Sequence, residues 1–221
     1  ESFKNYCIRD VEVEREVRKR LNIFDLIPFE KKLYTLDQII NDRGVLLDLE
    51  LIDKAIQIDT EQTKKLTEVF RQGTGLENPR SLKDIKDLIK DRTGEDVPSI
   101  TKGNLKELQE RFKDYEDISI ALEVREQLSR TSVAKFQKMK EVACRDGRAR
   151  GLMFFYGART GRWAGRLLQP QNLPGGGLKY LDTALDCVRY GDLELMELLY
   201  DNPADVLSNC LRPAIIPAKG K

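Results

Sequence analysis

The sequence predicts a mainly α-helical protein built around a long antiparallel helical hairpin, with a small β-sheet near the base of that hairpin. In two long segments, 48–71 and 116–143, apolar residues recur three and four positions apart, as in helices that bury one face. Two such helices bury their apolar stripes by packing against each other. The composition agrees with this fold class, because 34% of the residues are charged and only 7% are aromatic.

The composition also excludes several kinds of chemistry. The 221 residues include no histidine, which excludes histidine triads, zinc sites with histidine ligands and imidazole acid–base catalysis. No apolar run reaches the roughly 18 residues of a membrane span, so we expect a cytoplasmic protein without membrane contact. Four cysteines without C-x-x-C spacing predict free or buried thiols in a reducing compartment: Cys7, Cys144, Cys187 and Cys210.

Two helices are expected before the hairpin. The first spans 1–22, and Pro28 separates it from a second helical pattern. A turn at 42–44 and a short apolar segment at 45–47 follow, and Asp48 is a favourable N-cap for the first hairpin helix. The apolar side of the first helix is expected to carry Phe3, Tyr6, Val11 or Val13, and Val17.

The connection between the hairpin helices, 78–115, is the most polar part of the chain. We expect Gly73 to Gly75 to end the first hairpin helix, and Ser81 and Thr101 to cap two short helices. Free N–H groups at helix starts can contact phosphate, although a solvated polar face explains the same residues equally well. The candidate phosphate contacts are Asn78, Ser81, Lys83, Thr101 and Lys102.

The part after the hairpin should mix short strands and helices. Residues 152–156 are the best strand candidate, and we expect them to pair with 163–168 in a small antiparallel sheet. The segments 178–188 and 193–199 have helical periodicity, and Asp205 is expected to cap a last helix.

A basic segment lies between Arg145 and Lys179. It contains seven basic residues and one acid, so its net charge is +6 in a chain whose total is +1. Glycines and Trp163 lie among the arginines, a combination typical of nucleic-acid contact. An alternative stays open, because residues 180–211 carry seven acids and one arginine that could neutralise this segment within the fold.

Within the basic segment, Thr160-Gly161-Arg162 is followed nine residues later by Gln171-Asn172-Leu173-Pro174. This string resembles the T-G-R…Q-N-(I/L)-P element of family-A DNA polymerases, which lies where the palm domain begins. The resemblance implies that Arg162 and Gln171 reach minor-groove acceptors near the primer terminus, with Thr160, Arg159, Arg166 and Asn172 beside them. These acceptors are similar on every base pair, so contacting them checks pair geometry without reading sequence.

The chain departs from the family pattern at two places. The family often has two serines where this chain has Ala164 and Gly165, and a basic residue where this chain has the glycines 175–177. Arg166 could offset the missing charge.

Two further stretches resemble the thumb domain of the same family. Residues 42–48 resemble the turn that opens the thumb, and 122–132 resemble its second long helix, with Arg125 and Ser132 matching the family pattern. Lys135 lies close by, and a stripe of positive charge along a helical hairpin can follow a phosphate backbone. Ordinary solvation of a charged face is the alternative.

At the beginning of the chain, Tyr6 and Asp10 are four residues apart and so share a helix face. The pattern Tyr-x-x-x-Asp resembles the last motif of 3′–5′ proofreading exonucleases, in which the Asp binds a divalent metal and the Tyr orients water. By itself, this spacing also fits an ordinary amphipathic helix. Further metal-binding carboxylates would have to come from outside the chain.

The resemblance implies part of a polymerase of a phage or prophage-like kind, and the first residue, Glu1, also suggests a piece of a longer protein. Residues 1–29 would end the exonuclease domain, 30–143 would form the thumb with its tip at 78–115, and 144–221 would begin the palm. The implied partners are a primer–template duplex and, for the whole enzyme, dNTPs and Mg²⁺. No cofactor and no catalysis are expected of this chain alone.

Two readings from other classes stay open. A helical nucleic-acid-binding or scaffold protein without a polymerase parent would have the same hairpin and basic segment. A standalone nuclease would require acidic residues outside this chain and a functional Asp10.

Overall fold

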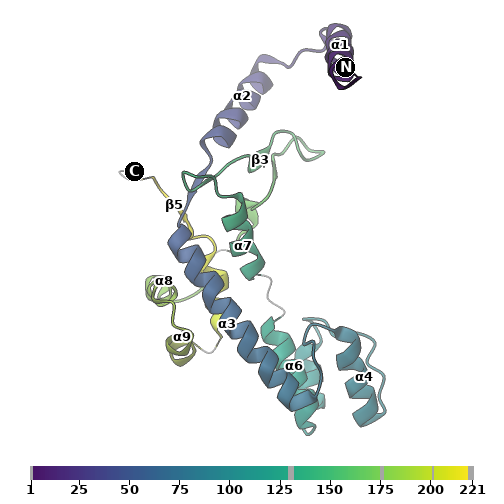
Figure 1. The fold of residues 1–221 in the computed structure, drawn as a ribbon, viewed down its shortest axis with the longest axis vertical. Helices are drawn as coiled ribbons and strands as arrows, with labels where there is room; N and C mark the ends of the chain where they lie inside the picture. Colours follow the sequence, from purple (N-terminus) through teal and green to yellow (C-terminus); the bar gives the residue numbers. More distant parts are fainter. Residues whose placement is uncertain (1, 129–131, 175–176, 201, 219–221) are drawn as a thin grey trace.

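The computed structural model describes residues 2–128, 132–174, 177–200 and 202–218. The molecule is elongated, with the N-terminal helix at one end, a small group of helices at the other end and short strands between them (Figure 1). It is mainly helical with a small amount of antiparallel sheet, as the sequence predicts, but the structure has two small sheets where one was expected.

Helix α3 (Leu49–Thr74) is the spine of the molecule, and its 26 residues extend for about 39 Å. Its start follows from Asp48, whose Oδ1 accepts a hydrogen bond of 3.0 Å from the backbone N of Leu51. It ends at Gly75, which adopts the left-handed conformation with φ of 73°. Both boundaries confirm the sequence-based expectation.

Two separate hydrophobic cores use α3. The base core contains Leu51, Ile52 and Ile58 of its N-terminal half, which pack with α7 (Ser132–Val142), α8 (Leu181–Tyr190), α9 (Leu193–Leu199) and α10 (Pro203–Cys210). The tip core contains Phe70 of its C-terminal half, packed among α4 (Leu82–Thr93), α5 (Leu105–Arg111) and α6 (Glu116–Leu128). Helices α6 and α7 both lie along α3, which confirms the predicted hairpin (Figure 1). The single helix predicted at 116–143 is described as two, because 129–131 lie outside the described residues.

Two predicted helix caps are wrong. The residue before α5 is Asn104, whose Oδ1 accepts hydrogen bonds from N and Oγ1 of Thr101, so Thr101 lies in the preceding turn. Asn202, rather than Asp205, caps α10, because its Oδ1 accepts a bond from the N of Ala204. In contrast, the prediction for Ser81 is confirmed, since its Oγ accepts a bond from the N of Asp84.

A three-stranded antiparallel sheet joins distant parts of the chain at the base core. Its strand order is β2 (Arg148–Ala149), β1 (Val45–Leu47) and β5 (Ile215–Ile216), with Leu46 opposite both Arg148 and Ile216. Gly44 precedes β1 with φ of 62°, and a Cβ there would lie 2.3 Å from the carbonyl O of Ala149. Only glycine allows the backbones to approach so closely.

The second sheet is a hairpin of β3 (Met153–Phe154) and β4 (Ala164–Gly165). It confirms the predicted pairing of the two segments, although β3 is shorter than the predicted strand at 152–156. A backbone turn ends the strand, because Gly157 donates to the carbonyl O of Phe154.

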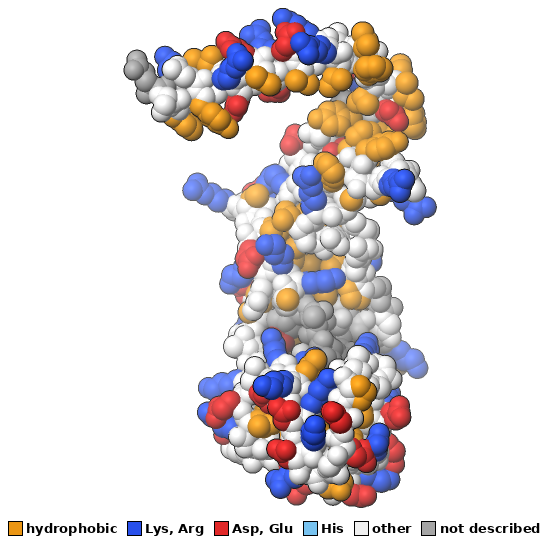
Figure 2. All heavy atoms as spheres, turned by 90° about the vertical axis from the view of Figure 1, so that its right-hand side faces the viewer, with side chains coloured by type: hydrophobic (Ala, Val, Ile, Leu, Met, Phe, Trp, Pro, Cys, Tyr) orange, Lys and Arg blue, Asp and Glu red, His pale blue; other side chains and the backbone are white. Residues whose placement is uncertain are grey.

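Helices α1 (Ser2–Leu21) and α2 (Pro28–Arg43) extend away from both cores (Figure 1). Both helices were predicted, but the apolar side of α1 is exposed, with Phe3 at 78% and Tyr6 at 63% of full exposure. Figure 2 shows hydrophobic side chains gathered along this end of the molecule. In α2 the one buried residue is the acid Asp37.

Candidate nucleic-acid interface

The β3–β4 hairpin presents the first half of the basic string to solvent. Its turn is closed by two backbone hydrogen bonds, from Gly161 N to Ala158 O at 2.9 Å and from Ala158 N to Arg162 O at 3.1 Å. Gly161 has φ of 79°, the left-handed conformation that such a hairpin loop requires. Arg159 and Thr160 therefore lie at the end of the turn, and both are exposed, as is Arg162.

Two arginines of the basic segment serve the fold. Arg148 donates from Nη1 to the carbonyl O atoms of Arg43 and Gly44, both at 3.3 Å. Arg150 donates from Nε to the carbonyl O of residue 42 and clamps Asp146 with both terminal nitrogens, at 2.9 and 2.6 Å. This pair of hydrogen bonds holds the pKa of the Asp146 carboxyl well below its ordinary value. The only acid of the segment is thus already paired within it.

The remaining arginines face solvent. In the described parts of the chain, neither Arg159 nor Arg162 has an ion-pair partner. The guanidinium of Arg166 stacks over the Phe154 ring at 4.0 Å from its centre. Two acids of 180–211 are paired elsewhere: Asp186 binds Arg189 of its own helix, and Glu197 binds Lys65 of α3. The segment keeps an exposed positive surface, as nucleic-acid contact requires.

The second half of the string is fixed beside the hairpin. Gln171 lies in the 3₁₀ turn η1 (Pro170–Asn172), and Leu173 is buried in the base core. Arg212 donates to the carbonyl O atoms of Leu173, at 2.7 Å, and Pro174, at 3.3 Å. The Gln171 carboxamide packs against Gly165 of β4, three residues after Arg162. The fold therefore brings the two halves of the string together.

Asn172 and Gln169 form a small exposed pair next to this contact. Nδ2 of Asn172 donates to Oε1 of Gln169 at 2.9 Å, and Gln169 has φ of 46°. One amide donor of Asn172 is therefore engaged within the loop.

Helix α2 holds the hairpin through a residue that the sequence did not single out. Asn41 donates from Nδ2 to the carbonyl O of Met153 at 3.0 Å, and its Oδ1 accepts from the N of Met153 at 2.9 Å. Above this contact, the Phe155 ring meets those of Tyr34 and Trp163 edge-on, at 5.7 and 6.2 Å between centres. An asparagine that pairs with a strand backbone 112 residues away has no local sequence signal.

The other predicted contacts lie outside the hairpin, some near the tip core at the opposite end of the molecule and others on α6 and α7. Near the tip core, Asn78 Oδ1 accepts from the N of Arg80, and the Ser81 hydroxyl caps α4. Arg125 in α6 and Lys135 in α7 are half-buried. The side chain of Ser132, at the start of α7, lies outside the described part of the chain. The candidates thus form a hairpin group and a separate group along α6, α7 and the tip.

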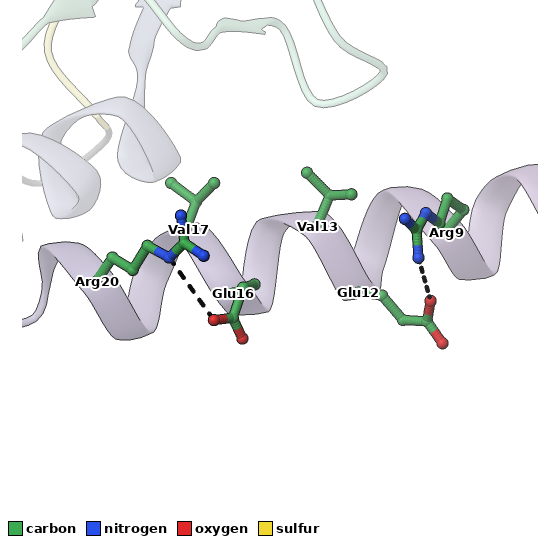
Figure 3. Close-up of a pocket in the computed structure, with 6 residues that line it drawn as sticks. All are labelled: Arg9, Glu12, Val13, Glu16, Val17 and Arg20. Carbon is green, nitrogen blue, oxygen red and sulfur yellow. Dashed lines mark hydrogen bonds and ion pairs between the residues drawn. The ribbon is translucent and has the colours of Figure 1, made fainter.

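Among the described residues, none forms a metal-binding group with Asp10. The described residues contain no group of three or more acidic or cysteine side chains that could hold a metal ion. Tyr6 and Asp10 are both exposed on α1. A shallow pocket on this helix is lined by one surface of α1 alone, with ion pairs from Arg9 to Glu12 and from Arg20 to Glu16 (Figure 3). Mg²⁺ chemistry is therefore not assigned to these residues.

The fold and this surface define a mainly helical protein with an exposed basic hairpin, and no described helix is long and apolar enough to cross a membrane. The chain is similar to a protein named DNA polymerase from Bacillus phage SP02, with 43% identity over all 221 residues. The chain spans 34% of that relative's length. No family model and no solved structure matches the chain.

Proposed function

We propose that this chain is part of a DNA-directed DNA polymerase of family A and that it grips the primer–template duplex. The observation that carries this proposal is the 43% identity, over the whole chain, to a protein named DNA polymerase. The exposure of Arg162 and Gln171, together with the contact between Gln171 and Gly165, supports the assignment of the string to DNA contact.

In this proposal the hairpin group contacts the end of the primer. Arg162 and Gln171 donate hydrogen bonds to the purine N3 and pyrimidine O2 acceptors of the minor groove, which every base pair offers. Arg159, Thr160 and Arg166 lie on the same hairpin and contact the adjacent phosphates. Asn172 keeps one amide hydrogen available besides the one bonded to Gln169.

The helices of residues 30–143 act as a thumb that follows the duplex away from the primer terminus. Helix α3 is about 39 Å long, which corresponds to about 11 base-pair steps at 3.4 Å each. The tip, with Asn78, Ser81 and the free N–H groups at the start of α4, contacts the backbone about one duplex turn from the hairpin. Arg125, Ser132 and Lys135 contact phosphates between them.

The chemical step belongs to the remainder of the longer polymerase. Mg²⁺ and dNTPs bind there, and residues 144–221 form the entry to the palm. Residues 1–29 are the end of a 3′–5′ exonuclease domain, to which Tyr6 and Asp10 contribute when the other carboxylates are present. The chain alone therefore incorporates no nucleotide, which a primer-extension assay with Mg²⁺ tests directly.

Binding of a labelled primer–template duplex, followed by fluorescence anisotropy at several salt concentrations, tests the grip. Arg162→Ala should weaken binding by about 1–3 kcal/mol, or roughly 5- to 150-fold, because a base-edge contact is lost. Arg18→Ala in α1 is the matched control, since Arg18 is exposed and its removal changes the net charge equally. It should change the affinity much less.

Two results would count against the proposal. If Arg162→Ala and Arg18→Ala weaken binding equally, Arg162 has no specific contact. If single strands and unrelated polyanions bind as tightly as the duplex, a general nucleic-acid-binding helical module explains the chain better than a polymerase thumb and palm.

A further inference from the structure

Gly165 leaves a space that the side chain of Gln171 fills. A Cβ built on Gly165 would lie 2.1 Å from Nε2, 2.7 Å from Oε1 and 2.8 Å from Cδ of Gln171. All three distances are far below van der Waals contact. The carboxamide thus rests directly on the backbone of β4, where any other residue would place a side chain.

The backbone of Gly165 does not itself require glycine. Its φ is not among the positive values of the chain, and it pairs with Met153 in a regular antiparallel strand. Glycine within a strand weakens it, and often marks a place where another group approaches the backbone closely. The close group here is the Gln171 carboxamide.

The backbone two residues after Gln171 is held by other contacts. Leu173 is buried in the base core, and Arg212 holds its carbonyl O. Gln171 itself is exposed, so its long side chain would otherwise sample many rotamers. Ordering a glutamine side chain costs up to about 1.5–2 kcal/mol, and a surface that orders it before binding removes part of that cost.

We infer that Gly165 is a positioning residue, which seats the Gln171 carboxamide so that its amide hydrogens meet the minor-groove acceptors of the duplex. This inference rests on the proposed function. Arg162 lies three residues before Gly165, so their Cα atoms are at most about 11 Å apart, or about three base-pair steps. The seat therefore directs Gln171 to base pairs that neighbour those reached by Arg162.

Substitution of Gly165 by alanine separates positioning from folding. The group that the new Cβ meets is the far end of a flexible side chain, so the carboxamide moves while the backbone stays in place. Alanine also lowers the entropy of the unfolded chain, so the stability should stay the same or rise. Gly177→Ala is the matched control, because a Cβ there meets nothing within 4 Å and its φ is not positive.

Two measurements on the 221-residue chain test the inference. In ¹⁵N-labelled protein without DNA, the side-chain amide signals of Gln171 are assigned by their loss in Gln171→Ala. They should shift in Gly165→Ala and stay in place in Gly177→Ala. With primer–template duplex, Gly165→Ala should weaken binding about 2- to 10-fold, as expected for one hydrogen bond. Gln171→Ala should weaken it equally, and the double variant should be no weaker than either.

Different results overturn different statements. If the Gln171 amide signals are unchanged in Gly165→Ala, Gly165 does not position the Gln171 carboxamide. Wild-type affinity in Gly165→Ala, beside weakened binding in Gln171→Ala, overturns its role in aiming the carboxamide. Failure of the wild-type chain to bind the duplex at all overturns the proposed function and the recognition role together, while the amide signals still decide independently whether Gly165 orders Gln171.

Discussion

Removal of the Asn41 side chain should detach the basic hairpin from α2. Asn41 makes two hydrogen bonds with the backbone of Met153, of 3.0 and 2.9 Å, and its Nδ2 also lies 3.1 Å from Oδ2 of Asp37. Asp37 is 3% exposed, and its Oδ1 has no hydrogen-bond partner. Asn41→Ala leaves that buried carboxylate with Gln38 as its remaining donor.

The expected cost follows from these three bonds. Each neutral bond to Met153 contributes about 1 kcal/mol, and a bond to a carboxylate about 1.5–3 kcal/mol, so Asn41→Ala should cost about 3.5–5 kcal/mol. Part of this cost appears as local opening of β3, because the hairpin can separate from α2 while both cores stay folded. The Met153 amide hydrogen should then exchange faster with solvent, and the increase in its exchange rate measures how much of the destabilisation comes from this local opening.

Urea denaturation measures the loss of global stability, and amide hydrogen exchange at Met153 measures the local opening of the hairpin. Asn5→Ala is the matched control, since Asn5 is exposed on α1 and its side chain makes no hydrogen bond within the described structure. If Asn41→Ala lies within about 0.5 kcal/mol of this control, and Met153 exchange is unchanged, Asn41 does not hold the hairpin.

Two further predictions concern the base core. Gly44→Ala should lower the free energy of unfolding by well over the roughly 1–3 kcal/mol expected for left-handed backbone strain, because the new Cβ would also meet the Ala149 carbonyl. Gly75→Ala is the control, since Gly75 also has a positive φ but a Cβ there meets nothing within 4 Å. In urea denaturation, Gly75→Ala should therefore show the strain alone. Burial raises the pKa of the Cys210 thiol from 9.0 to about 12. The pKa of this thiol is higher in the folded than in the unfolded chain, so the protonated thiol favours the folded state. Its contribution to the free energy of unfolding is complete below about pH 9, and it decreases by up to about 1.4 kcal/mol per pH unit between about pH 9 and pH 12. Unfolding free energies at pH 8 and 10.5 should show this loss, and Cys210→Ala should lack it.

The parts of the fold that depend on local sequence could be predicted. Asp48 begins α3 and Gly75 ends it, because a cap and a left-handed glycine act within one turn of the helix. The same reasoning failed at Thr101, since Asn104 bonds back to it and starts the helix three residues later. Two polar residues in one turn compete for the cap, and the local sequence does not decide between them.

The long hairpin was predicted, but sheet pairings and side-chain contacts between distant segments were missed. The order β2-β1-β5 pairs Leu46 with residues about 100 and 170 positions later, and strands of two or three residues carry little periodicity. The string that contains Arg162 and Gln171 could be found in the sequence. The contact of the Gln171 side chain with Gly165, and the hydrogen bonds of Asn41 with Met153, could not. The net charge of the basic segment also overestimated how many arginines are available for DNA, because Arg148 donates hydrogen bonds to backbone carbonyls that no sequence pattern reveals.

One unbroken helix passes through both hydrophobic cores, and this continuity makes α3 a lever. A tilt of about 10° at the base core would carry the far end of a 39 Å helix through about 7 Å, or two base-pair steps. The start of α3 follows β1, and β1 pairs with β2, which lies in the segment that leads to the hairpin. In the proposed grip, the tip end of α3 lies about one duplex turn from the hairpin arginines, so such a tilt would change how the two ends fit the same DNA.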